Sequence, residues 1–211
     1  MKKTAIVLVL VLLCCTLFAE SFVDGSLGYA FLRVKETTTV RDITIVQNQK
    51  TSALSTEATF MFFPGTSRFG ADLGLSVLFP ISVTVNEREY DVSFFDCDYC
   101  PRIGLAWKAD LDKNLVMLSS LGYQVMMDFE SKTSGGRTAK TKLFIHGVYA
   151  QDRLVYKLNG NVRINAGLTL YFPIVGTVTT TISGIEGKSK QVITYSGVLI
   201  NPFIGIDIKT K

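Results

Sequence analysis

The chain has 211 residues, of which 47% are hydrophobic and 19% are charged, and its formal net charge is +4. This length allows one domain, and so small an excess of positive charge gives no reason to expect nucleic acid or an acidic substrate as a partner. Beyond the N-terminal segment, no stretch approaches the roughly 20 consecutive apolar residues of a transmembrane helix.

Residues 1–19 have the three parts of a secretory signal peptide, and residues 20–211 are the predicted mature domain. Two lysines near the start precede an apolar run at residues 5–13, and the small residue Ala19 provides a cleavage site. Cleavage there removes both lysines and lowers the formal net charge from +4 to +2. The sequence therefore predicts an exported protein.

Eight segments of the mature chain alternate between apolar residues and small or polar ones, which is the pattern of β-strands with two different faces. Their length of roughly ten residues matches a tilted transmembrane strand. Short connections alternate with long ones, as they do in outer-membrane barrels. In chain order, the predicted strands cover residues 22–33, 54–63, 69–79, 101–108, 115–129, 142–156, 162–172 and 198–208.

The third segment, residues 69–79, indicates which solvent the apolar face meets. One face carries Phe, Ala, Leu, Leu, Val and Phe, whereas the other carries Gly70, Asp72, Gly74 and Ser76. Glycine is costly in a strand that faces water, but small residues suit the cramped interior of an eight-stranded barrel. The large apolar face is therefore predicted to meet lipid, and a soluble periplasmic barrel that binds a ligand is the alternative.

The sixth segment, residues 142–156, fits this pattern least well. Leu143, Ile145 and Tyr149 are interpreted as its lipid-facing residues, but Gln151 and Arg153 continue the same face. Two polar side chains on the lipid side require a β-bulge or an early end of the strand near residue 150.

Two of the long connections, residues 35–52 and 174–190, are rich in Thr, Val and Ile, which favour pleated backbone. They directly continue predicted strands, so we expect both hairpins to extend beyond the membrane as a β-rich fence. A projecting sheet with an open edge is a template for the addition of another strand. The connections at residues 80–100 and 131–140 are predicted to be loops.

An internal repeat predicts the number of strands. Similar segments occur in the same order in both halves of the chain, which indicates two halves of four strands each. The predicted fold is therefore all-β, a single eight-stranded antiparallel up-and-down transmembrane β-barrel. The paired segments are SLGY at 26–29 and 120–123, GLSVLFPI at 74–81 with GLTLYFPI at 167–174, and PRIGLAWK at 101–108 with PFIGIDIK at 202–209.

With this pattern, the mature chain resembles the small eight-stranded outer-membrane barrels of the OmpX and OmpW kind, or a spirochaete version of them. The resemblance covers residues 20–211 and rests on the strand pattern. It implies a cell outer membrane location, with lipid around the barrel. One feature departs from that family, whose last strand usually ends in an aromatic residue that the assembly machinery reads, because this chain ends Ile-Lys-Thr-Lys.

The inward faces of the predicted strands carry eight charged residues and the only histidine. An isolated buried charge is costly, so the mixed signs predict a salt-bridged polar plug that leaves no general pore; a proton or ion path is the alternative. The histidine has no local catalytic motif, so we expect no catalytic site, metal or cofactor. The predicted lumen polar network is Asp24, Glu57, Asp72, Arg102, Lys108, Asp128, His146, Arg163 and Asp207.

The cysteines fall into two pairs. Cys97 and Cys100 have CxxC spacing in a connection of an exported protein, where disulfides are permitted. We predict a small local disulfide between them; the redox or half-metal-site alternative lacks a thioredoxin-like βαβ context. Cys14 and Cys15 lie in the signal peptide, and the bulky leucines before them disfavour lipid acylation.

The sequence is compatible with three classes of function. The first is a surface-exposed structural or interaction protein that binds a host or cell-surface partner through its long outer loops. The second is a passive conduit for small hydrophobic molecules. The third is an enzyme, which is kept only as a class to be tested. The soluble periplasmic ligand-binding barrel is a further alternative.

Overall fold

The computed structural model describes residues 19–40, 43–94, 96–134, 137–183 and 189–210, which form nine strands and their connections. All residues of the predicted signal peptide except the last lie outside the described residues. Within the described ranges, no helix is long and apolar enough to cross a membrane. The strands are β1 (Ala19–Val40), β2 (Ile43–Pro64), β3 (Phe69–Val85), β4 (Arg88–Tyr90), β5 (Asp98–Asp112), β6 (Leu115–Ser134), β7 (Arg137–Asn159), β8 (Val162–Ile182) and β9 (Ser189–Thr210).

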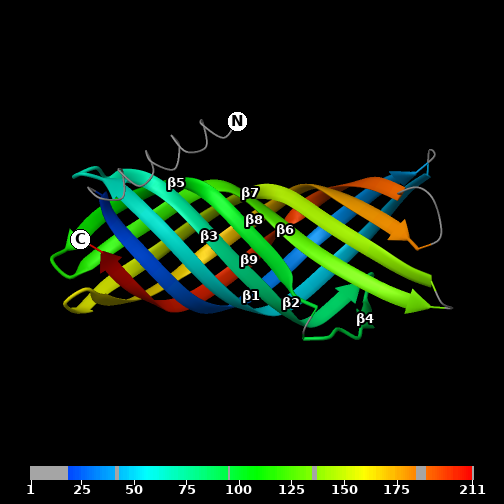
Figure 1. Ribbon diagram of the computed structural model, residues 1–211, viewed down its shortest axis with the longest axis horizontal. Helices are drawn as coiled ribbons and strands as arrows, with labels where there is room; N and C mark the ends of the chain where they lie inside the picture. The colour runs from blue at the N-terminus through cyan, green and yellow to red at the C-terminus, as the bar shows by residue number, and fades with distance from the viewer. Residues whose placement is uncertain (1–18, 41–42, 95, 135–136, 184–188, 211) are drawn as a thin grey trace.

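Eight long strands close into a ring in which neighbours are antiparallel (Figure 1). Their order is β2-β1-β9-β8-β7-β6-β5-β3, and the pairing of β3 with β2 closes the ring. The remaining strand, β4, has three residues and pairs with the C-terminal end of β3. Asn86 and Glu87 connect them with positive φ angles, as in a type I′ hairpin turn. The barrel wall therefore has the eight strands that the repeat predicts.

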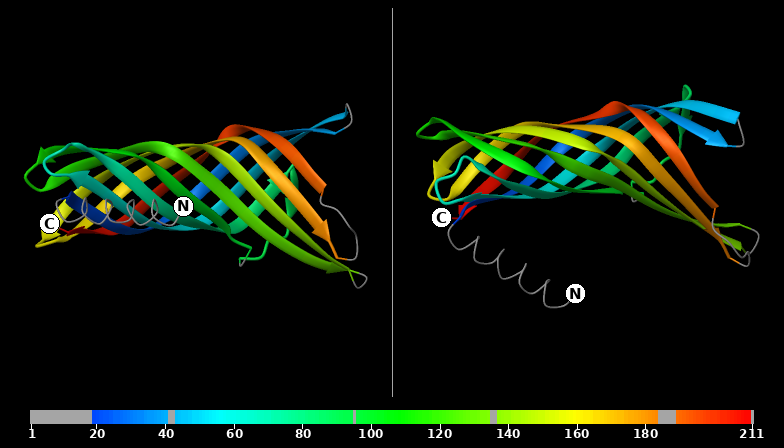
Figure 2. Two further views of the ribbon diagram at one scale, coloured as in Figure 1. Left: turned by 45° about the horizontal axis from the view of Figure 1, so that its top comes forward. Right: turned by 90° about the horizontal axis from the view of Figure 1, so that it is seen from above.

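The two ends of the barrel differ, as the lengths of the connections predict. The first and last strands begin and end together at one end, which also carries the short turns after β2, β5 and β7 (Figure 1). The β1–β2, β6–β7 and β8–β9 hairpins project from the opposite end (Figure 2). Short turns face the periplasm in outer-membrane barrels, so we name these the inner end and the outer end.

Side chains alternate between the lumen and the outside along the wall. In β3, Asp72 and Ser76 are buried, whereas Leu73 and Leu75 are 43% and 45% exposed. Soluble proteins rarely expose large contiguous apolar surfaces, but a membrane-spanning barrel presents such a surface to lipid. This apolar belt includes Val23, Leu27, Phe31, Leu54, Leu73, Leu75, Ile103, Leu105, Leu121, Leu154, Ile164, Leu168, Ile200, Ile204 and Ile206.

The two faces of β7 are the reverse of those predicted. Ile145, Tyr149, Gln151 and Arg153 are buried in the lumen, whereas Val148 is exposed on the outside. β7 pairs with β6 in a single register along its length. In this ladder there is therefore no bulge or early strand end that exchanges the inward and outward faces of β7. The prediction assumed that apolar side chains always face lipid, but the outer part of the lumen is itself apolar.

The predicted fence is present and is larger than expected. β1 and β2 pair out to Val40↔Ile43, and β8 and β9 pair out to Thr180↔Ser189. The connection at residues 131–140, predicted to be a loop, is largely strand, because β6 and β7 also pair out to Ser134↔Arg137. We define the fence as the described residues within 33–50, 128–142 and 177–192.

Leu73 is the fifth residue of β3 and lies on the apolar belt, so a charge at this position should be strongly destabilising. Leu73→Arg is expected to lower the free energy of unfolding by ~2–4 kcal/mol, because the guanidinium would lie near the bilayer midplane. Equilibrium unfolding in lipid vesicles, with heat-modifiable gel mobility as a check of folding, measures this change. The control Ile45→Arg, in the fence, should change stability by no more than about 0.5 kcal/mol. Equal stability of the two variants would show that the belt does not face lipid.

Candidate functional site: the lumen and its outer mouth

Three layers of side chains fill the lumen along the barrel axis. The lower apolar layer, at the inner end, contains Phe22, Met61, Phe63, Ala106, Leu118 and Val155. The ionic layer follows and contains Asp24, Glu57, Thr59, Asp72, Arg102, Gln151, Arg153, Asn165 and Thr169. The upper apolar layer lies beyond it and contains Ala30, Leu32, Val34, Ala53, Leu78, Cys100, Met126, Ile145, Tyr149, Tyr171, Ile193, Tyr195 and Leu199.

Arg102, on β5, lies at the centre of the ionic layer. Its guanidinium donates to Glu57 Oε1 at 2.8 Å and to Asp72 Oδ2 at 3.3 Å. It also donates to Thr59 Oγ1 at 2.8 Å and to Gln151 Oε1 at 3.0 Å. The side chains of this arginine and of both carboxylates are at most 2% exposed. Because the pairs are buried, removing one partner would leave an uncompensated charge.

A second arginine, Arg153 on β7, extends the ionic layer. Its Nη1 lies 3.2 Å from Asp24 Oδ1, and its Nη2 donates to Gln151 Oε1 at 2.5 Å. Gln151 Nε2 in turn donates to Glu57 Oε1 and to Thr169 Oγ1, each at 2.8 Å. Gln151 and Arg153 were not predicted to be lumen residues, because the predicted faces of β7 were reversed. Two polar side chains two residues apart on a strand were the signal that could have placed that face inward.

Two glycines provide the space that the ionic layer occupies. Tyr149 Oη donates to Asp72 Oδ2 at 2.6 Å, and the guanidinium carbon of Arg102 lies 5.2 Å from the Tyr149 ring centre, within the range of a cation–π interaction. A Cβ at Gly74 would lie 2.7 Å from Arg102 Nε, and a Cβ at Gly104 would overlap the Tyr149 hydroxyl. The small inward residues therefore make room for specific neighbours.

The remaining charged residues of the predicted network lie closer to the inner end. Lys108 forms an ion pair with Glu20. The guanidinium carbon of Arg163 lies 5.0 Å from the centre of the Phe22 ring. Asp207, buried on β9, is the cross-strand neighbour of Arg163 on β8. These residues face inward as predicted. Asp207 is also the cross-strand neighbour of Asp24, so it borders the ionic layer.

His146 does not belong to the lumen network, and its predicted inward position is wrong. The ring lies on the outside of β7, where Nδ1 is hydrogen-bonded to Tyr123 Oη and where Val148 and Ile174 flank the same surface. The reversed faces of β7 explain the error. Because this is the only histidine of the chain, a Ser-His-acid triad inside the lumen has no base.

Cys97 and Cys100 are both free thiols, so the predicted disulfide is wrong. Cys100 is the third residue of β5 and is buried in the upper apolar layer. Cys97 precedes that strand, in the connection from β4. The prediction assumed that both cysteines lie in a loop, but β5 already begins at Asp98. Side chains three residues apart point to opposite faces of an extended chain, which separates the two thiols.

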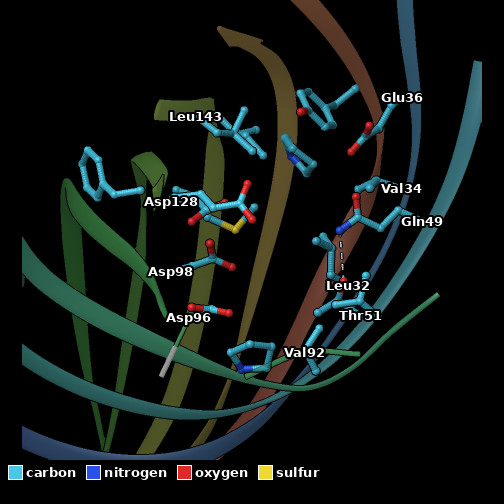
Figure 3. A pocket seen from close by; sticks show the side chains of 18 of the residues that line it. Leu32, Val34, Glu36, Gln49, Thr51, Val92, Asp96, Asp98, Asp128 and Leu143 are labelled. Carbon is cyan, nitrogen blue, oxygen red and sulfur yellow. Dashed lines mark hydrogen bonds between the residues drawn. The ribbon is translucent and has the colours of Figure 1, made fainter. Parts of the chain in front are cut away.

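Beyond the upper apolar layer, the lumen opens into a mouth cavity of about 280 Å³ (Figure 3). Asp96, Asp98 and Asp128 lie on one side of this cavity, and Glu36 lies across it on β1. Asp128 faces inward as predicted, although it lies outside the ionic layer. Apolar side chains form much of the remaining wall, including Leu32, Val34, Met126, Leu143 and Ile145.

The fence has an open edge at the outer end of β2, which we call the β2 edge and define as residues 43–47. This segment, Ile-Thr-Ile-Val-Gln, pairs with β1, whereas the ladder between β2 and β3 ends at Gln49. Ile43, Ile45 and Val46 are 66%, 47% and 44% exposed. Natural proteins commonly protect edge strands with Lys or Pro, and the segment contains neither.

A closed antiparallel ring with an apolar belt, a filled lumen and long hairpins at one end defines an outer-membrane β-barrel protein. The fold is similar to that of the outer membrane protein OprG from Pseudomonas aeruginosa, with a TM-score of 0.59 and 13% sequence identity over 90% of this chain and 96% of that one. It is also similar to a major outer membrane protein from Thermus thermophilus, with a TM-score of 0.52 and 11% identity over 91% of this chain and 99% of that one. A third similar structure is Neisserial surface protein A, with a TM-score of 0.51 and 11% sequence identity over 90% of this chain and 97% of that one.

These likenesses concern the fold, since the sequence identities are low. No protein-family model matches the sequence, and no curated protein is significantly similar to it. The belt and the fold together place the chain in the outer membrane and set aside the soluble periplasmic barrel.

Arg102 should be the most sensitive position of the ionic layer. Arg102→Ala is expected to lower the free energy of unfolding by about 3–5 kcal/mol, because two buried carboxylates lose their main cation. Urea titration of the protein in lipid vesicles measures the loss. The matched control is Lys113→Ala, in the exposed turn between β5 and β6, with an expected change within about 0.5 kcal/mol. A loss of less than about 1 kcal/mol for Arg102→Ala would contradict the assigned role.

The three filled layers should also prevent general ion flow through the barrel. Planar-bilayer recordings of the purified, heat-modifiable monomer are expected to show no stable, large, unselective conductance, because an eight-stranded barrel has an interior only just wide enough for its side chains. A general porin in the same bilayers serves as the positive control. Steady unselective current from the folded monomer would mean that the layers do not seal the lumen.

Proposed function

We propose that the protein is a surface-exposed interaction protein that binds an extended segment of a partner polypeptide along the β2 edge. The observation that carries this proposal is a strand segment with a partner strand on one side, exposed apolar side chains and no protecting Lys or Pro. Strand addition to such an edge gives affinity through main-chain hydrogen bonds and specificity through alternate side chains.

The position of the β2 edge supports a protein partner over lipid. On β1, the belt residue Phe31 is followed on the same face by Arg33 and Lys35, both of which are exposed. Ile43 and Ile45 pair with β1 still farther out. Lipid chains do not reach apolar side chains that lie farther out than the exposed basic residues Arg33 and Lys35. Contact with another polypeptide is therefore the better explanation for these exposed apolar side chains.

The proposed role requires no catalytic group, metal or cofactor. The only histidine is engaged with Tyr123 on the outside of the barrel. Among the residues that the structure describes, no group of three or more His, Cys, Asp or Glu side chains is arranged to hold a metal ion. Binding of a partner segment along the β2 edge is a non-enzymatic role.

A passive conduit for small hydrophobic molecules is the second candidate. The observation that favours it is an interruption of the β8–β9 ladder between Tyr171 and Val175, at the level of the upper apolar layer. The buried ion pairs of Arg102 argue against passage along the whole axis. A hydrophobic solute would therefore have to leave the lumen through the wall.

A double substitution at the β2 edge tests the interaction. Ile43→Lys with Ile45→Lys should reduce binding of the purified barrel, in lipid nanodiscs, to host cells or extracellular matrix by about tenfold or more, because edge lysines oppose strand addition. Val192→Lys, an exposed apolar position of the fence on β9, is the matched control and should bind normally. Heat-modifiable mobility verifies that each variant is folded.

Deletion of residues 177–188 provides a second variant, which removes the outer β8–β9 hairpin while β2 remains. Unchanged binding by the β2-edge variant would overturn the proposal. Unchanged binding together with impaired uptake of an apolar solute by the deletion variant would favour the conduit.

A further inference from the structure

We propose that the mouth cavity is a binding site for a linear aliphatic diamine, a short methylene chain with an ammonium group at each end. The cavity has carboxylates on two opposing sides and apolar side chains in its walls (Figure 3). The site lies inside the barrel and contains no residue of the β2 edge. A negative result for one proposal therefore does not contradict the other.

The charge of the cavity is of one sign. Six carboxylates line it, and no Lys, Arg or His is found among the described residues of the lining. At the level of the cavity, Arg33 and Lys35 on β1 and Lys142 on β7 face the other way and are exposed on the outside. Low-dielectric walls around charges of one sign concentrate the opposite ion. The cavity therefore selects a cation.

One end of the cavity is formed by Glu36 and Tyr195, which are direct cross-strand neighbours on β1 and β9. The Glu36 carboxylate has no hydrogen-bond or ion-pair partner among the described residues, and burial raises the pKa of this carboxyl, which lies beyond the apolar belt. The Tyr195 side chain is 5% exposed, and its hydroxyl has no hydrogen-bond partner among the described residues.

Buried polar groups are normally hydrogen-bonded, so the unpartnered hydroxyl of Tyr195 beside a half-buried carboxylate indicates a place for a polar group of a ligand. An ammonium group satisfies both, since it donates hydrogen bonds to the carboxylate and the hydroxyl and neutralises the charge.

The other end of the cavity is formed by Asp96 and Asp98, with Asp128 beside them (Figure 3). These carboxylates come from the connection before β5, from β5 and from β6. They lie across the cavity from Glu36, which places a second anionic wall opposite the first. A ligand that engages both walls carries positive charge at both ends.

The apolar walls of the cavity favour an organic dication over a metal ion. Leu32 and Val34, on the same side of the cavity as Glu36, and Leu143, on the side of Asp128, give the cavity apolar walls. Methylene groups gain free energy by leaving water for such walls. The described carboxylates form no cluster of three or more that is arranged to hold a metal. The volume of about 280 Å³ is at the small end of ligand pockets, which suits an unbranched chain.

Isothermal titration calorimetry of the full barrel in nanodiscs at low ionic strength tests the proposal, with 1,5-diaminopentane and 1,6-diaminohexane as probes. Both should bind saturably, whereas 1-aminopentane should bind about tenfold or more weakly, because it engages one acidic end only. Pentane-1,5-diol should give no saturable heat. Equal affinity of the monoamine and the diamine, or no saturable binding of either probe, would overturn the proposal.

Substitutions locate the site. Glu36→Gln and Asp98→Asn, at opposite ends of the cavity, should each weaken diamine binding by about tenfold, since each removes one charge-assisted contact. Tyr195→Phe should weaken it by about threefold or more, as expected for a lost neutral hydrogen bond. Glu89→Gln, an exposed carboxylate on β4 outside the cavity, is the control and should leave affinity unchanged.

Heat-modifiable mobility confirms the folding of each variant, and an isosteric substitution at either end suffices for the test if the other fails to fold. Full competition by equimolar MgCl₂ would show that the cavity takes any cation and would overturn the diamine assignment. Unchanged affinity in both Glu36→Gln and Asp98→Asn would place the binding elsewhere.

Discussion

The neutralisation of buried carboxylates by two arginines is the constraint on which the rest of this barrel depends. Glu57, Asp72 and Asp24 lie in a lumen without room for bulk water, and Arg102 and Arg153 neutralise them there. A buried charge without a partner costs several kcal/mol, so the strands that carry these residues must meet in one register. Gly74, whose missing side chain leaves room for Arg102, is part of the same constraint.

The filled lumen confines functional surface to the outer end of the barrel. The lower apolar layer and the ionic layer occupy the inner part of the lumen, and the upper apolar layer forms the floor of the mouth cavity. Beyond that floor, charges separate by sign, with carboxylates such as Glu36 inside and cations such as Arg33 outside. The alternation of side chains along one strand produces both surfaces, since neighbouring residues point to opposite faces.

The two proposed sites use different parts of the same extended strands. The mouth cavity uses inward side chains of β1 and β9, such as Glu36 and Tyr195, whereas the β2 edge uses main-chain groups and the exposed side chains of Ile43 and Ile45. Both sites exist because the strands continue past the lipid. Outside the membrane, main-chain groups can remain available for a partner, which is not tolerated within the hydrocarbon layer.

The sequence by itself determined the eight wall strands, the lipid-facing surface and most of the inward charged residues, because strand alternation is a local property that needs no knowledge of neighbours. It failed for β7, where His146 was placed inward, and for Cys97 and Cys100, which do not pair. Local polarity identifies a face only where the lumen is polar and the outside is apolar. Ile145 and Tyr149 face inward because ring closure brings them against apolar side chains of distant strands, and that contact, like the pairing of Arg153 with Asp24, was decided only by the tertiary structure.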